Sequence, residues 1–134
     1  MRIAICRFAI CFVSMAALAA QRPDYSGTWT FNPDKSKNIG MMAQMKMTQT
    51  IEQASTALDV TSDTNFQGNE QQMKTHYDLT GKSVTNDSPM EGPCETVSKW
   101  SGHAIVTSWT GNGSVAGTKT VRTETRSLSP DGRP

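Results

Sequence analysis

Hydrophobic and polar residues alternate with a period of two along most of the chain after residue 20. In the stretch 72–79, for example, Met73, Thr75, Tyr77 and Leu79 share one face and polar residues occupy the other. This period is typical of β-strands, and threonine suits a pleated sheet with one wet face. The pattern predicts eight strands, at 27–31, 45–52, 58–61, 72–79, 83–86, 95–100, 103–110 and 114–127.

Short polar turns separate these segments, and no window shows a sustained helical period. Gly111-Asn112-Gly113 predicts a hairpin turn, because asparagine and glycine accept positive φ. The predicted fold class is therefore all-β, an antiparallel up-and-down meander that closes into a β-barrel and so removes its edges. The chain closes on a Ser129-Pro130-Asp131-Gly132 turn. Either a further strand is missing after this turn, or the sheet keeps an open edge that invites pairing with another chain.

Residues 1–20 have the features of a signal peptide. Arg2 and Arg7 precede an apolar run at 8–18, and Ala17-Leu18-Ala19 supplies the small residues that signal peptidase reads. The run is too short to span a bilayer as a helix, which takes about 20 apolar residues. We expect cleavage to leave 21–134 as a single β-barrel domain without a membrane anchor, in the periplasm or outside the cell.

The charge balance of the chain argues against nucleic acid as a partner. Cleavage would remove Arg2 and Arg7, leaving 11 of the 13 basic residues against 12 acidic ones. There is no basic stripe, so nucleic acid is a poor partner.

Cys94 would be the only remaining cysteine, which leaves either an inert thiol or an intermolecular disulfide. Only 14 of residues 21–134 are Ile, Leu, Val or Phe. We expect a thin core in which Met, Trp and Thr replace aliphatic side chains.

Gly27-Thr28-Trp29, on the first predicted strand, resembles the Gly-x-Trp signature of lipocalins. The run Asn32-Pro33-Asp34-Lys35-Ser36 that follows, and the closing Leu128-Ser129-Pro130-Asp131-Gly132, look like small secreted lipocalin-like proteins of bacteria, most of them uncharacterised. The resemblance implies a lipocalin-like β-barrel with Trp29 at its closed end. It also implies an arginine packed over this tryptophan, for which Arg122 and Arg126 are the candidates.

We expect a non-enzymatic binder of a small apolar ligand. His76 falls on the polar face of its strand and His103 falls beside a turn, so neither suggests a catalytic residue, and the sequence indicates no cofactor. A barrel of about eight strands holds side chains or one small ligand. The candidate ligand-binding residues are Trp29, Met45, Met47, Tyr77 and Trp109.

Two alternative functions remain open. The first is a structural or interaction module that self-associates through an open sheet edge. The second is a periplasmic copper binder, because the 41–47 run contains Met41, Met42, Met45 and Met47, and thioethers suit Cu(I). The same methionines could instead be core residues or line a cavity, since methionine fills irregular space. We therefore assign no metal site.

Overall fold

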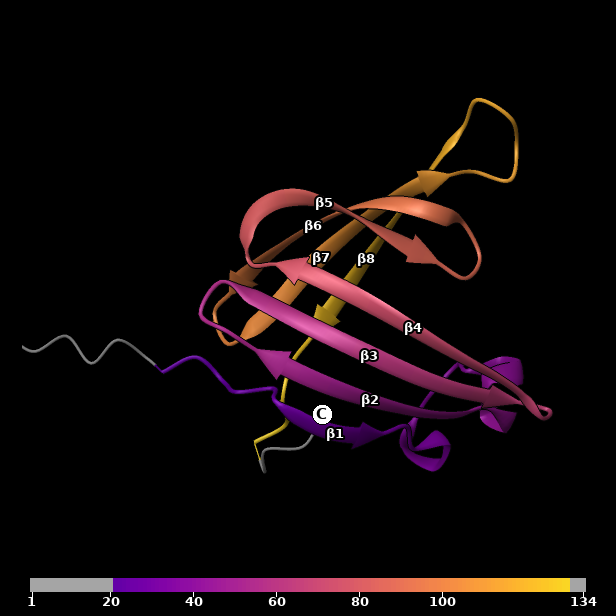
Figure 1. The fold of residues 1–134 in the computed structure, drawn as a ribbon, viewed down its shortest axis with the longest axis horizontal. Coiled ribbons are helices and arrows are strands. Elements are labelled where there is room, and N and C mark those ends of the chain that lie inside the picture. The colour runs from indigo at the N-terminus through magenta and orange to yellow at the C-terminus, as the bar shows by residue number, and fades with distance from the viewer. Residues whose placement is uncertain (1–20, 131–134) are drawn as a thin grey trace, which may run out of the picture.

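The computed structural model describes residues 21–130 as two antiparallel four-stranded β-sheets (Figure 1). The expected signal peptide at 1–20 lies outside the described residues, as do Asp131 and Gly132. None of the described helices is long and apolar enough to cross a membrane. The first sheet contains β1 (Gly27–Thr30), β2 (Lys46–Gln53), β3 (Ala57–Phe66) and β4 (Asn69–Asp78), and the second contains β5 (Thr80–Ser88), β6 (Gly92–Ser101), β7 (Ala104–Asn112) and β8 (Lys119–Arg126).

Neighbours in each sheet are neighbours in sequence, which confirms the predicted all-β antiparallel meander. Within each sheet every strand pairs with the next one in sequence, and two short 3-10 helices, η1 (Pro33–Lys35) and η2 (Gly40–Gln44), lie between β1 and β2. All eight predicted strands are present. The strand predicted at 58–61 extends further, to Phe66, because the β3–β4 turn uses Gln67 and Gly68, which have φ of 51° and 86°. Positive φ at both positions suits a two-residue hairpin.

The predicted turn at Gly111-Asn112-Gly113 was wrong. Gly111 and Asn112 belong to β7, and the connection to β8 is the longer loop 113–118. Gly111 is buried beside Cys94, where an added Cβ would come within 2.7 Å of the Cys94 sulphur. This glycine therefore serves close packing between β6 and β7 rather than a turn.

Side chains connect the two sheets where β4 passes into β5, with only Leu79 between them. The Asn86 amide oxygen accepts from the His76 backbone N–H at 2.9 Å. Its Nδ2 donates to the His76 carbonyl and to Thr96 Oγ1, both at 2.7 Å. Asn86 thus takes the place of a backbone partner for β4 while it remains bonded inside the second sheet.

The opposite edges of the sheets also meet through side chains. The Tyr25 hydroxyl lies 2.9 Å from both the His103 carbonyl and the Arg126 carbonyl, at the ends of β7 and β8. Arg126 donates to Gln49 Oε1 of β2 at 3.3 Å. Consistently, the chain after β8 runs toward β1 (Figure 1).

Closure into a β-barrel is not observed. Within residues 21–130, no strand pairing joins β1 to β8 or β4 to β5. The outer edges of β1 and β8 are therefore not paired with another strand in the described part of the chain. Self-association through such an edge stays a prediction.

The core is small, as the composition predicted. Six polar side chains are buried with the apolar ones, three of them threonines. No described methionine belongs to the buried core; several lie instead on the wall of the cavity described below. The buried hydrophobic residues are Tyr25, Ile51, Leu58, Val60, Tyr77, Leu79, Cys94, Ile105 and Trp109.

Replacing Asn86 by alanine tests the connection between the sheets. Asn86→Ala leaves the His76 N–H and carbonyl without their partner, and we expect the free energy of unfolding to fall by about 2 to 4 kcal/mol. Asn112→Ala is the matched control, because Asn112 is exposed and accepts one bond from Lys119; we expect a change within about 0.5 kcal/mol. Urea unfolding of both variants measures the difference. Equal stability of the two would contradict this role for Asn86.

A candidate ligand cavity between the two sheets

A cavity of about 790 Å³ lies between the inner faces of the sheets, toward the β3–β4 hairpin end. Its size falls within the range of small-molecule sites, about 300 to 1,000 Å³. Its apolar wall consists of Met42, Met45, Met47, Val60, Met73, Tyr77, Pro89 and Trp109. Its polar wall consists of Gln49, Ser62, Thr64, Gln71, Gln72, Thr75, Asp87, Ser88 and Arg122.

The register of the first sheet explains why methionines distant in sequence share this cavity. Met47 of β2 lies opposite Thr64, and Met73 of β4 lies opposite Ser62. Directly opposed residues project from the same face of a sheet, so both methionines face inward. Met42 and Met45 come from the η2 segment, which leads into β2.

The aromatic part of the wall is held in place by charged residues of β8. The rings of Tyr77 and Trp109 meet edge to face, with centroids 6.2 Å apart. Glu124 accepts hydrogen bonds from Trp109 Nε1 at 3.2 Å, from Arg126 at 3.1 Å and from Tyr77 Oη at 3.5 Å. Arg122 lies over the Trp109 ring at 4.7 Å, and Arg126 lies over the Tyr77 ring at 5.7 Å. The two rings therefore present a fixed surface to the cavity.

The same surroundings keep Tyr77 protonated. Burial raises the pKa of Tyr77 from 10.0 to about 12, and the Glu124 carboxylate adds to the increase. Arg126 and Arg122 act in the opposite direction without cancelling it. Tyr77 is therefore neutral near pH 7 and keeps its proton for the bond to Glu124.

Cys94 does not line the cavity. Its side chain is 1% exposed, and its thiol lies 3.5 Å from Glu91, which also pairs with Arg122 at 3.8 Å. A thiol so deeply buried cannot reach a second molecule without local opening. The position favours the inert thiol over the intermolecular disulfide.

The structure brings together four of the five residues predicted to bind a ligand: Met45, Met47, Tyr77 and Trp109 all line the cavity. Trp29 does not line it. Its indole N–H donates to the Tyr25 carbonyl at 2.8 Å, and its ring borders a separate hollow of about 300 Å³ beside η1.

Several wall residues were missed. Met73 and Thr75 share a face with Tyr77 in the alternation of 72–79, so the sequence did contain a signal for them. Ser88 and Arg122 line the cavity because the second sheet packs on the first, and no local sequence pattern predicts that packing. The arginine implied over Trp29 is not observed, since Arg122 stacks on Trp109 and Arg126 on Tyr77.

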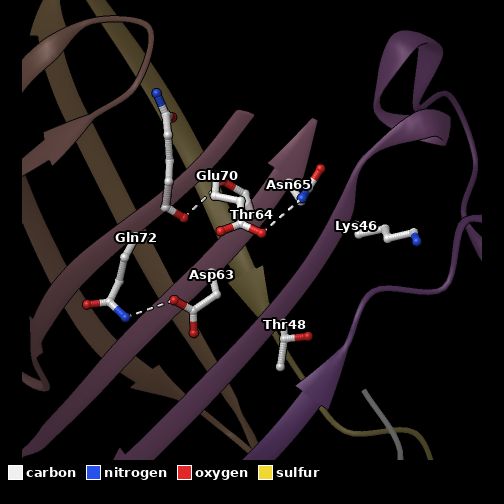
Figure 2. A pocket seen from close by; sticks show the side chains of 8 residues that line it. Lys46, Thr48, Asp63, Thr64, Asn65, Glu70 and Gln72 are labelled. Atoms are coloured by element: carbon white, nitrogen blue, oxygen red, sulfur yellow. Dashed lines mark hydrogen bonds between the residues drawn. The ribbon is translucent and has the colours of Figure 1, made fainter. Parts of the chain in front are cut away.

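A second hollow, of about 530 Å³, lies on the outer face of the first sheet beside the β3–β4 hairpin. Asn65 donates to Glu70 at 3.2 Å, and Gln72 donates to Asp63 at 2.8 Å (Figure 2). These side chains are exposed and bonded across neighbouring strands. We interpret this hollow as the wet face of the sheet, because its polar groups already pair with one another.

Metal binding receives no support from the usual ligands. In residues 21–130, no group of three or more His, Cys, Asp or Glu side chains is placed to hold a metal ion. His76 lies on the outer face of β4, with its Nδ1 2.6 Å from Asp59. Thioether binding of Cu(I) stays a prediction: Met42, Met45 and Met47 line the cavity with Met73, whereas Met41 is 78% exposed and apart from it.

Comparison of the chain with protein-family models, curated proteins and solved structures found no match. The lipocalin-like family therefore stays a prediction that rests on the residues quoted for it.

The raised pKa of Tyr77 predicts a loss of stability in alkali. Between pH 10 and about 12 the unfolded chain releases the Tyr77 proton and the folded chain keeps it, so the free energy of unfolding falls by up to about 1.4 kcal/mol per pH unit. Burial also raises the pKa of Tyr25, so Tyr77→Phe is needed to isolate the effect. Urea unfolding across this range should show a shallower decline for Tyr77→Phe. Identical slopes would mean that Tyr77 titrates normally.

Proposed function

We propose that the protein binds one small, largely apolar molecule in the cavity between its sheets. The observation that carries this proposal is the convergence of four methionines and two fixed aromatic rings on one space of about 790 Å³. A space of this size with an apolar wall buries most of the surface of a small ligand. That burial supplies the free energy of binding.

The chemistry of the wall suits ligands of varied shape. Methionine has three rotatable bonds and a polarizable sulphur, so Met47 and Met73 can adapt to a ligand. Trp109 and Tyr77 cannot move as freely, because Glu124 binds the polar ends of both side chains. A flexible side of the cavity thus faces a rigid one.

The charged residues of the cavity support binding without catalysis. Asp87 and Arg122 are the charged residues that line the cavity, and Arg122 is engaged by the Trp109 ring and Glu91. Glu124 and Arg126, which do not line it, pair with each other at 3.1 Å. General acid–base or nucleophilic chemistry needs a group free to exchange a proton or attack, with a second group to activate it. No histidine or cysteine lines the cavity in the described part of the chain.

The proposal extends to the family and the compartment. A secreted, incompletely closed lipocalin-like β-barrel, acting in the periplasm or outside the cell, accounts for the leader-like residues 1–20, the meander order of the strands and Gly27-Thr28-Trp29 on β1. An opening between β1 and β8 would then give a ligand one way in.

A hydrocarbon probe tests the proposal directly. Diphenylhexatriene fluoresces strongly only in an apolar environment, and we expect saturable fluorescence with the parent protein. Ser62→Phe places a ring in the cavity and should weaken binding at least about tenfold, because less of the probe can be buried. Thr61→Phe, one residue away on the opposite face of β3, is the matched control and should bind like the parent.

Circular dichroism and melting of both variants ensure that only folded protein is compared. If Ser62→Phe does not fold, Gln71→Trp blocks the same cavity from β4. No saturable binding by the parent, or equal loss in the Ser62 and Thr61 variants, would overturn the proposal.

A further inference from the structure

Two hydroxyl groups of largely buried residues lack hydrogen-bond partners in the described part of the chain, and both border the cavity. Among the six buried polar side chains, Asn86 and Thr96 bond to each other, and Ser98 bonds to Thr107. Thr75 and Ser88 are only 8% and 7% exposed, and within residues 21–130 their hydroxyls have no hydrogen bond. The two unpaired groups are the two that line the cavity.

The unpaired hydroxyls belong to the same corner of the cavity. Thr75 is adjacent to His76 in β4, and Ser88 is two residues beyond Asn86 in β5. Since Asn86 bonds both backbone groups of His76, these parts of β4 and β5 lie side by side. Within residues 21–130 the only fully buried side-chain nitrogen or oxygen without a partner is Trp100 Nε1, so the Thr75 and Ser88 hydroxyls stay open to the cavity. A ligand that covers them excludes water from them, so the site favours a ligand that supplies a hydrogen bond at this point.

The charges around the cavity disfavour an ionic ligand. The cationic groups are Arg122 and Arg126 of β8, and each is already held by a carboxylate and an aromatic ring. Glu91 of the β5–β6 loop pairs with Arg122, Glu124 of β8 pairs with Arg126, and Asp87 of β5 lines the cavity. An anion would meet an excess of carboxylates. A cation would find both rings already stacked with arginines.

We propose that the ligand is an uncharged apolar molecule with a hydroxyl or carbonyl group, which Thr75 and Ser88 bind at the corner between β4 and β5. This inference rests on the proposed function, because it specifies the ligand of the same cavity. The hydrocarbon part lies against Met47, Met73 and Trp109, and the single polar group lies against the two hydroxyls.

Competition between ligands of equal chain length tests the inference. Dodecan-1-ol, dodecanoate and dodecyltrimethylammonium displace bound diphenylhexatriene, and we expect the alcohol to bind most tightly. Thr75→Val and Ser88→Ala remove the hydroxyls with little change of shape. Each should weaken dodecan-1-ol about fivefold, the effect of one net hydrogen bond. Binding of diphenylhexatriene, which has no polar group, should not weaken by a comparable factor.

Thr50→Val is the matched control, because Thr50 is exposed on β2 and does not border the cavity. If the parent does not bind diphenylhexatriene, the proposed function itself fails. If it does, but the ions bind as well as the alcohol, or the alcohol binds Thr75→Val and Ser88→Ala as it binds the parent, only this inference is overturned. In that case the Thr75 and Ser88 hydroxyls form hydrogen bonds with water and not with a ligand. Circular dichroism and melting show whether each variant is folded. If Thr75→Val does not fold, Ser88→Ala alone tests the inference.

Discussion

The Asn86 side chain determines how the rest of the structure can be arranged, because it connects two sheets that share no strand pairing. Its amide bonds both backbone groups of His76 and the Thr96 hydroxyl. Tyr25 makes the corresponding connection at the opposite edge, with the ends of β7 and β8. Between these two connections the inner faces of the sheets leave a gap, while the sheets stay joined at both edges. The space between them is the proposed ligand site.

The shortage of aliphatic side chains explains why this space is not filled. Leu58, Leu79 and Ile105 pack with Tyr25 in the buried core, and hydrogen bonds such as that between Ser98 and Thr107 complete it. Few large side chains remain for the hairpin end. There the methionines line a cavity and do not belong to the core. A thin core and a cavity between the sheets are therefore two consequences of the same composition.

The alternation of hydrophobic and polar residues predicted most of the strands, and it predicted some of the residues that line the cavity. The alternation in 72–79 located an inward face, so Tyr77 was expected beside Met45 and Met47. Gly111 misled because a glycine required for packing on Cys94 looks, in sequence, like a turn glycine. Trp29 misled because its indole is turned to the Tyr25 carbonyl. The unpaired state of Thr75 and Ser88 could not be predicted, since it depends on which groups the second sheet brings near.

The central claim is that a ligand enters the space between the sheets, and the methionine methyl groups report on it most directly. In a nuclear magnetic resonance titration with diphenylhexatriene, the methyl signals of Met42, Met45, Met47 and Met73 should shift together. Met41 and Met90 are 78% and 94% exposed, do not border the cavity, and should not shift. Shifts confined to Met41 and Met90, or none at all, would contradict the claim.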